Sequence, residues 1–453
     1  MSVNIHKFNL NDKYIVLDVP SASVHVVDEI VYDLVDDFER HTEDELINKY
    51  KNKYDEATIR EAISEINELK EREMLFTQDE RLLKANYNSD NIIKAMCLHV
   101  AHDCNLSCRY CFASQGNFKG QRMLMDEETG KRALDFLIEN SGNRRNLEVD
   151  FFGGEPLMNF EVVKKLVKYG REVEKRHNKH FRFTITTNGM LLDDDKIDFI
   201  NENMDNVVLS LDGRREINDH MRPTLNGKGS YDVIVPKFKK LVEKRGKKDY
   251  YIRGTFTNEN LDFSEDLKTF YEEGFKKTSI EPVVTDEREP YAIREEHLSK
   301  ILDEYEKLSK DYIEIRKKDG DFLFFHFMID LTQGPCAVKR TVGCGAGSEY
   351  VAITPEGEIY PCHQFVGETD FKLGNIYEGI KNTELRDNFK CTNIFTKDKC
   401  TECWARYYCS GGCHANAYYS NKDINVPFEL GCEMEKKRIE CAISIVANEM
   451  EDE

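Results

Sequence analysis

The cysteines of this chain are gathered into two separate regions. Of its 14 cysteines, four lie between Cys97 and Cys111, and ten lie between Cys336 and Cys441. In a long chain without a secretory signal, disulfides are disfavoured, so clustered cysteines more often indicate metal or redox chemistry. We therefore expect two metal-bearing regions in a protein of 453 residues, which is long enough for two or three domains.

The charge and hydropathy of the chain exclude two classes of partner. The formal net charge of −20 has the wrong sign for a nucleic-acid partner, because such partners are held by Lys and Arg side chains. The N-terminal stretch lacks the basic, apolar, small-residue order of a secretory signal. No apolar run approaches the roughly 20 residues of a membrane span. We expect a soluble, cytoplasmic protein that binds neither nucleic acid nor membrane.

Residues 1–88 form the first predicted domain. The segments IHKFNL, YIVLDV and SASVHVV have the alternation of short strands, and helical patterns follow at 28–38, 42–50 and 55–73. This order resembles a winged helix-turn-helix, a fold that usually binds DNA, but here acids outnumber bases about two to one. Two interpretations stay open: a strand edge that accepts a peptide by strand addition, or a packing module.

Residues 89–318 alternate strands with helices. Six such repeats run from AMCLHVAH to KTSIEPVV, which predicts a parallel sheet curved into a partial (β/α)6 barrel with ligands at the carboxyl ends of its strands. Residues 290–318 are expected to add one or two solvent-facing bridging helices. The third domain, residues 319–453, is rich in cysteine and turns, and we expect metal clusters to hold it together.

The segment CNLSCRYCF places Cys104, Cys108 and Cys111 in one short loop after a predicted strand. Three thiolates can hold three irons of a 4Fe–4S cluster and leave the fourth iron open to a small molecule. A zinc site would need a fourth ligand, and the nearby His102 has poor spacing for that role.

This loop resembles the cysteine loop of the radical S-adenosylmethionine (SAM) superfamily. The resemblance implies that the open iron chelates the amino and carboxylate groups of SAM, whose reductive cleavage yields a 5′-deoxyadenosyl radical. It also implies that Tyr110 lies against the adenine and that the backbone of Phe112 bonds the exocyclic amine of the adenine.

Further motifs stand at the ends of the following predicted strands. GGEP supplies a carboxylate that can only accept hydrogen bonds, which suits the SAM amino group. TTNG supplies an amide side chain, and SLDG supplies two groups suited to ribose hydroxyls. YIRGT supplies a cation, either for a ligand carboxylate or for a structural ion pair. The predicted SAM contacts in these motifs are Gly153, Gly154, Glu155, Asn188, Ser210, Asp212 and Arg253.

The second cysteine region resembles the SPASM extension of radical SAM enzymes, which carries two auxiliary 4Fe–4S clusters. Its core is CTECWARYYCSGGC, with two cysteines upstream around Gly357 and one downstream. The resemblance implies three 4Fe–4S clusters in all. The implied ligands are Cys344, Cys362 and Cys413 for auxiliary cluster I and Cys400, Cys403, Cys409 and Cys432 for auxiliary cluster II.

Auxiliary cluster I would need a fourth ligand, for which Cys336 is the candidate and a substrate thiolate the alternative. Cys97, Cys391 and Cys441 fit no ligand position. Cys97 stands in an apolar strand pattern and Cys441 on the apolar face of the last helix, where a free cysteine behaves as a small hydrophobe.

Over its whole length the chain resembles maturases of the six-cysteine peptides known as SCIFF. This resemblance implies an enzyme that installs thioether links from cysteine sulfur to carbon in a ribosomally made, Cys-rich peptide, as in sactipeptides and ranthipeptides. The peptide's leader would pair with a strand edge of residues 1–88. A flavodoxin or ferredoxin would supply electrons.

Two other functions are weighed against this one. Anaerobic sulfatase maturases, which form formylglycine, begin almost at the cysteine loop and carry an acidic base after the position of Cys362. Here His363 follows, either as a base or as a solvent-facing side chain. A non-enzymatic iron–sulfur scaffold would leave Glu155, Ser210 and Asp212 without a role.

Overall fold

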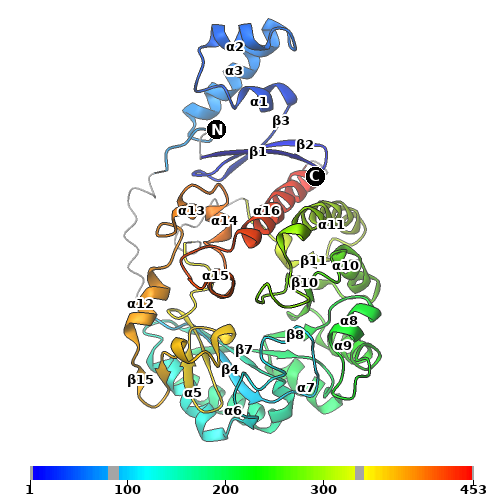
Figure 1. Cartoon of the computed structure of the whole chain (residues 1–453), viewed down its shortest axis with the longest axis vertical. Coiled ribbons are helices and arrows are strands. Elements are labelled where there is room, and N and C mark those ends of the chain that lie inside the picture. The colour runs from blue at the N-terminus through cyan, green and yellow to red at the C-terminus, as the bar shows by residue number, and fades with distance from the viewer. Residues whose placement is uncertain (1–3, 80–90, 332–340, 451–453) are drawn as a thin grey trace.

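A computed structural model of the chain describes residues 4–79, 91–331 and 341–450. The N-terminal part consists of an antiparallel sheet of order β1-β2-β3 followed by three helices (Figure 1). Its elements are β1 (Ile5–Leu10), β2 (Lys13–Asp18), β3 (Ser23–Val27), α1 (Glu29–Leu34), α2 (Glu43–Tyr50) and α3 (Glu56–Glu71).

Capping side chains start these three helices where the sequence predicts them. Asp28 and Asp55 accept hydrogen bonds from the first-turn backbone, and Thr42 forms a capping box with Glu45. The first helix is shorter than predicted, since it ends at Leu34 and continues as turns.

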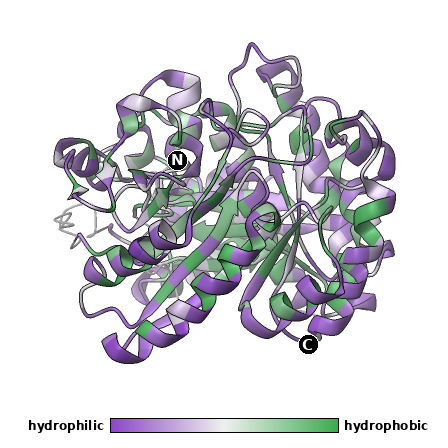
Figure 2. Ribbon diagram, turned by 90° about the horizontal axis from the view of Figure 1, so that it is seen from below, coloured by the Kyte–Doolittle hydropathy of each residue, from purple (hydrophilic) through white to green (hydrophobic). Residues whose placement is uncertain are grey.

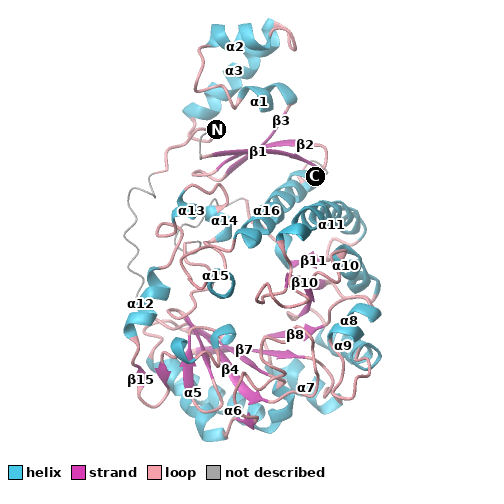
Figure 3. Ribbon diagram, viewed as in Figure 1, coloured by secondary structure: helices cyan, strands magenta, loops and turns pink. Residues whose placement is uncertain are grey.

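Six parallel strands with helices between them form the centre of the molecule, and this confirms the predicted partial barrel. Their order is β10-β9-β8-β7-β6-β4, and the helices cover the outside (Figure 3). The strands are β4 (Ala95–His102), β6 (Asn146–Gly153), β7 (His180–Thr187), β8 (Asn206–Ser210), β9 (Tyr251–Phe256) and β10 (Lys277–Pro282). The helices are α5 (Glu127–Glu139), α6 (Phe160–His177), α7 (Asp194–Asn203), α8 (Arg215–Met221), α9 (Tyr231–Arg245), α10 (Phe263–Glu272) and α11 (Leu298–Lys318), and a short β5 (Met123–Leu124) pairs with β4.

Alternate residues of each strand face opposite sides of the sheet. On β7, Phe181, Phe183 and Ile185 are fully buried in the core shared with the helices, whereas Thr184 and Thr186 face the inner side. Figure 2 shows hydrophobic strands surrounded by helices whose outer faces are hydrophilic. The inner side of the barrel is therefore polar and available for chemistry.

The C-terminal region extends the same sheet at both edges. β11 (Leu323–Phe324) pairs in parallel with β10, and β12 (Tyr350–Ile353) pairs in parallel with β4. From β12 the sheet continues antiparallel through β13 (Glu358–Tyr360), β14 (Gly374–Asn375) and β15 (Gly379–Ile380). The remaining helices are α12 (Thr383–Cys391), α13 (Asp398–Thr401), α14 (Arg406–Cys409), α15 (His414–Asn421) and α16 (Glu429–Glu449).

One sequence-based expectation is wrong here. α11 is not solvent-facing, because it buries Ile301, Tyr305 and Leu308 while it packs between α10 and α16. The Cys-rich region also contributes Phe365 and Phe389 to an apolar cluster that reaches Cys97 on β4. The residues of this cluster come from short turns and strands without a sustained period, so the sequence does not reveal it.

The N-terminal sheet lies against the C-terminal helix: β1 and β2 pack on α16 (Figure 1). In the described part of the chain, no helix is both long and apolar enough to span a membrane.

Candidate active site and cluster-binding loops

The loop that carries Cys104, Cys108 and Cys111 follows β4 directly. It is fastened to the segment after α8, since the Ser107 N–H donates to the Pro223 carbonyl over 2.8 Å. The Sγ of Cys104 accepts from the Leu106 N–H and from Asn188 Nδ2. The sequence predicted that the three thiols and Asn188 belong to one site, and the structure brings them together.

The buried thiols of this loop ionise readily only if bound iron stabilises their thiolate forms. Burial, followed by the neighbouring carboxylate and thiols, raises the pKa of Cys104 to about 12, and burial raises the pKa of Cys108 to about 11. Because iron binds thiolates, bound iron would offset this cost of ionisation. Among the described residues, no group of three or more His, Cys, Asp or Glu side chains has an arrangement that could hold a single metal ion.

Gly153 and Gly154 let the end of β6 cross close to the cysteine loop. A Cβ on Gly153, whose φ is +129°, would lie 2.1 Å from the Ala101 oxygen, and one on Gly154 would lie 2.2 Å from the Asp103 oxygen. The N–H groups of Gly154 and Glu155 donate to these same two carbonyls. The GGEP motif is thus needed for the close approach of two backbones.

Glu155 is completely buried and caps the 3-10 turn Pro156–Asn159. Its carboxylate accepts from the Leu157 N–H (3.0 Å), Thr187 Oγ1 (2.7 Å) and the Asn188 N–H (2.8 Å). Burial raises the pKa of Glu155 to about 7 against these bonds. No cationic side chain of the described residues forms an ion pair with it, so a ligand ammonium group would fit its electrostatics.

Tyr110, Asp212 and Arg222 form a buried hydrogen-bonded group beside the cysteine loop. The Tyr110 hydroxyl donates to Asp212 Oδ2 (2.7 Å) and accepts from Arg222 Nη1 (2.7 Å), while the Thr255 N–H donates to Asp212 Oδ1. Burial raises the pKa of Asp212, and Arg222 opposes this shift. The sequence predicted Tyr110 and Asp212, but it missed Arg222, which no motif marks.

Ser210, the last residue of β8, pairs with Arg253, which lies within β9. Arg253 is half exposed, and its Nε lies 3.9 Å from Glu281 Oε1 on β10. Glu281 also pairs with His326 at 3.0 Å. Burial alone would raise the pKa of Glu281, but His326 and Arg253 hold it well below its usual range. Arg253 therefore has a structural partner and is still accessible to a ligand.

His363 lies in the same region as the cysteine loop. Its ring centroid is 5.5 Å from that of Phe112 and 5.2 Å from that of Phe152 on β6, and its Nδ1 is 3.2 Å from the Tyr350 hydroxyl. Burial, followed by Arg253, lowers the pKa of His363 to about 4. The solvent-facing alternative is therefore wrong: His363 is half-buried and neutral at neutral pH.

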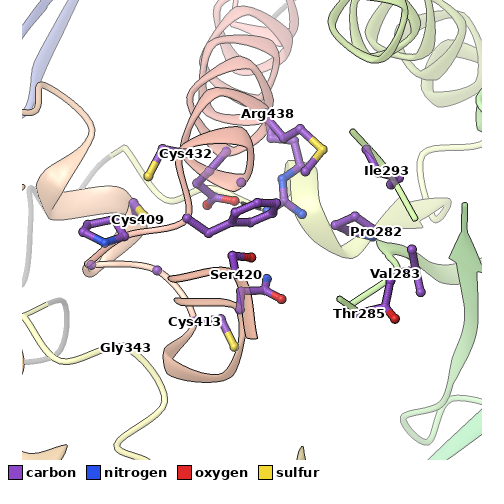
Figure 4. Close-up of a pocket in the computed structure, with 18 of the residues that line it drawn as sticks. Pro282, Val283, Thr285, Ile293, Gly343, Cys409, Cys413, Ser420, Cys432 and Arg438 are labelled. Atoms are coloured by element: carbon purple, nitrogen blue, oxygen red, sulfur yellow. Dashed lines mark hydrogen bonds and ion pairs between the residues drawn. The ribbon is translucent and has the colours of Figure 1, made fainter. Parts of the chain in front are cut away.

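The cysteines assigned to auxiliary cluster I lie near one another. Burial, followed by the thiols of Cys413 and Cys344, raises the pKa of Cys362. Cys344 and Cys413 line a cavity of about 370 Å³ between the end of β10 and α16. Figure 4 shows Pro282 and Val283 on one side of this cavity, the sulfurs of Cys409, Cys413 and Cys432 on the other, and Arg438 above it. The remaining candidate ligand, Cys336, lies outside the described residues.

All four cysteines assigned to auxiliary cluster II line one cavity of about 360 Å³, namely Cys400, Cys403, Cys409 and Cys432. Burial raises the pKa of Cys409 to about 12 and that of Cys432 to about 11, and in both cases neighbouring thiols contribute. Outside these sites, Cys97 and Cys441 are buried among apolar residues as predicted, and Cys391 is exposed.

Comparisons with known families agree with this geometry. Residues 98–269 match the radical SAM superfamily, and residues 344–404 match the SPASM iron-sulfur cluster-binding domain. The first match contains the cysteine loop and most of the barrel, and the second contains four of the seven auxiliary cysteines. The chain contains a radical SAM domain followed by a SPASM domain.

Several relatives of this chain are maturating enzymes. The chain is 28% identical over 357 residues to the cysteine-type anaerobic sulfatase-maturating enzyme of Clostridium novyi (strain NT), which covers 72% of this chain and 88% of that enzyme. Among solved structures, anSMEcpe with bound AdoMet has a TM-score of 0.64 at 22% identity, over 78% of this chain and 98% of the other. Streptococcus suis SuiB bound to precursor peptide SuiA has a TM-score of 0.50 at 17% identity, over 94% and 98%. These two similarities show a shared fold.

Proposed function

We propose that this protein is a radical SAM maturase that installs thioether links between cysteine sulfurs and carbon atoms of a ribosomally made, Cys-rich peptide. The observation that carries the proposal is the cavity of about 370 Å³ that joins the end of the last barrel strand to Cys344 and Cys413. It offers a substrate thiol a place between the barrel and auxiliary cluster I.

The residues of the cysteine loop and of the strand ends would hold the SAM cluster and SAM. Cys104, Cys108 and Cys111 would ligate the cluster, and Glu155 would bind the ammonium group of SAM. The other proposed SAM contacts are Tyr110, Phe112, Gly153, Gly154, Asn188, Ser210, Asp212 and Arg253. Bound SAM, once reductively cleaved, supplies a 5′-deoxyadenosyl radical.

The cavity suits a short peptide segment. Pro282, Val283 and Ile293 give one wall apolar surface, while Arg438 and Glu435 supply charge on α16. A peptide cysteine that entered here would meet Cys344 and Cys413, and its thiol would be deprotonated on binding metal. His363, which follows Cys362 directly and has its ring 5.5 Å from that of Phe112, is the proposed base for the thiol proton, and its pKa of about 4 makes it a weak acceptor.

The N-terminal domain would bind the leader of the peptide. No strand of the described residues pairs with the outer edge of β3, and Val26 on this strand is exposed. A leader strand added here would raise the effective concentration of the core peptide at the barrel. The proposed division of the chain is therefore 1–88 for leader recognition, 89–318 for the radical SAM barrel and 319–453 for the SPASM domain.

Electrons would enter from an external donor such as a flavodoxin or ferredoxin. The proposal includes three 4Fe–4S clusters, with Cys336 or a substrate thiolate as the fourth ligand of auxiliary cluster I. The chemistry is oxygen-sensitive and is expected to take place in the cytoplasm.

A peptide assay under anaerobic conditions tests the proposal. The reconstituted, reduced enzyme and SAM are incubated with a Cys-rich peptide that carries its leader, and the product is alkylated and weighed. Each link should remove two hydrogens and one alkylatable thiol. The Cys104→Ala enzyme serves as a control and should leave the peptide unchanged. If 5′-deoxyadenosine forms while the peptide keeps its mass and all thiols, the substrate assignment is wrong.

Formylglycine formation is the second candidate, because the C. novyi relative is a sulfatase-maturating enzyme that matches 72% of this chain. This reaction would consume a cysteine sulfur and create an aldehyde. A hydrazide probe would therefore label the product of this reaction, whereas a thioether product would stay unlabelled.

A further inference from the structure

The N-terminal domain contacts the loop assigned to auxiliary cluster II. We call this loop, residues 400–413, the cluster II loop. Three side chains of the N-terminal part make this contact: Asn4, His6 and Asp79. Each of them meets a residue that stands between two of the cluster II cysteines in sequence. The contact therefore lies on the cluster site itself.

Asp79 forms a buried ion pair with Arg406. Asp79 Oδ2 lies 2.8 Å from Arg406 Nη2, and the side chains of both residues are almost completely shielded from solvent. The Tyr407 hydroxyl donates to both oxygens of the same carboxylate, at 2.9 and 2.7 Å. Burial, followed by the bond to Asp79, raises the pKa of Tyr407 to about 12. One carboxylate thus binds two successive residues of the cluster II loop.

Arg406 connects Asp79 to two of the predicted ligands, Cys403 and Cys409. Its Nη1 donates to the Cys403 carbonyl over 2.8 Å. Arg406 also opens α14, which ends at Cys409. The guanidinium therefore links the backbone of one predicted ligand to the helical turn that carries the next. If its charge were left buried without a partner, this turn would have to move.

A second contact involves Trp404, the residue that follows Cys403. The ring of His6 on β1 stacks on Trp404 with a centroid distance of 3.7 Å and an interplanar angle of 4°. His6 Nε2 also lies 2.9 Å from Glu440 on α16, the helix that carries Cys432. The N-terminal domain thus contacts residues between Cys403 and Cys409, and also the helix that carries Cys432.

We infer that the N-terminal domain is a structural part of the auxiliary cluster II site, in which Asp79 is a positioning residue that fixes Cys403 and Cys409 through Arg406 and Tyr407. The inference rests on the proposed ligands of cluster II and goes beyond leader binding. It assigns to one domain both the capture of the peptide and the integrity of a cluster at the far side of the cavity.

The test compares the iron content and the electron paramagnetic resonance (EPR) spectra of reduced, reconstituted full-length variants. Asp79→Asn keeps the shape of the side chain and removes its charge. Asp18→Asn is the matched control, because Asp18 is also fully buried in the N-terminal domain but bonds only Ser21 and the Thr77 N–H among the described residues. Asp79→Glu restores the charge.

Asp79→Asn should lose about four irons per chain and one auxiliary EPR signal, because one 4Fe–4S cluster is no longer held. Its SAM cluster signal should still respond to SAM. Asp18→Asn should keep the wild-type iron content, and Asp79→Glu should recover most of the lost iron. If Asp79→Asn retains all its iron with unchanged signals and midpoint potentials, the inference is wrong.

If Asp79→Asn does not fold, Tyr407→Phe provides a second test. It removes one hydroxyl and should shift the midpoint potential of one auxiliary signal alone, while a wild-type potential would overturn the inference. Neither readout uses a peptide, so failure of the proposed thioether chemistry would appear only in the peptide assay. A wild-type enzyme with about eight irons would instead contradict the cluster assignment itself.

Discussion

At the scale of single residues, Glu155 is a carboxylate that has no ion-pair partner among the described side chains. Its carboxylate is completely buried and is met by neutral donors only. Glu155→Gln should therefore weaken SAM binding about 10- to 100-fold, which corresponds to one charge-assisted hydrogen bond. Equilibrium binding of SAM to the reconstituted enzyme measures this effect. Unchanged iron content would show that the cluster is intact, and unchanged affinity would refute the ammonium contact.

The pKa of Glu155 also predicts a pH dependence. Burial raises it from 4.5 to about 7, so the SAM-free folded protein holds a proton that the unfolded chain releases. This carboxyl therefore costs stability as pH rises from about 4.5 to about 7. A bound ammonium favours the ionised form, so SAM affinity should rise up to tenfold per pH unit toward pH 7 and then level off. Binding measured between pH 5.5 and 8.5 should show this slope in the wild type and not in Glu155→Gln.

Gly154 tests the backbone packing beneath the cysteine loop. Gly154→Ala would place a Cβ 2.2 Å from the Asp103 oxygen, and backbone cannot move aside as cheaply as a side chain. We expect a loss of about 3 kcal/mol in the free energy of unfolding and a loss of SAM-cluster iron. Gly320→Ala is the control, since its added Cβ meets nothing within 4 Å. Denaturant unfolding measures both variants, and an equal loss in their free energy of unfolding would contradict this explanation.

At the scale of elements, the cluster II loop should behave as one unit. Cys400→Ala removes one of four thiols that line a single cavity and should cost about four irons per chain. Cys391→Ala removes an exposed thiol that lines neither cluster cavity, and it should keep its iron. Iron and sulfide analysis of the two variants checks the assignment, which equal iron contents would disprove.

Elements with a clear period were predictable from sequence, and contacts across the chain were not. The strand Ala95–His102 matches its predicted bounds because it is a short apolar run that is buried along nearly its whole length, and burial along the helix Phe160–His177 repeats on one face. β12 has only four residues, and its pairing with β4 depends on tertiary packing. The same holds for the site: motifs revealed Glu155 and the cysteines, whereas Arg222 and Asp79 act through partners more than 100 residues away.

At the scale of the whole molecule, the proposed leader-binding strand and the proposed active site lie in different domains. The N-terminal sheet lies on α16, beside the SPASM region, and the barrel lies beyond it (Figure 1). A peptide held at β3 would reach the cavity as a tethered substrate. Removal of the leader should lower the modification rate about 10²-fold at micromolar peptide. Competition by free leader peptide would provide the control, and a leaderless peptide modified at full rate would contradict leader capture.

Transfer of deuterium distinguishes thioether formation from the other reactions. A Cys-rich peptide with its leader, deuterated at its non-exchangeable carbon positions, is incubated with the reduced enzyme and SAM, and 5′-deoxyadenosine and peptide are analysed together by mass spectrometry. The account predicts one deuterium in 5′-deoxyadenosine for each alkylatable thiol lost, with every sulfur retained in the peptide. Thiol loss without deuterium transfer, or deuterium transfer with loss of sulfur and a new aldehyde, would contradict it.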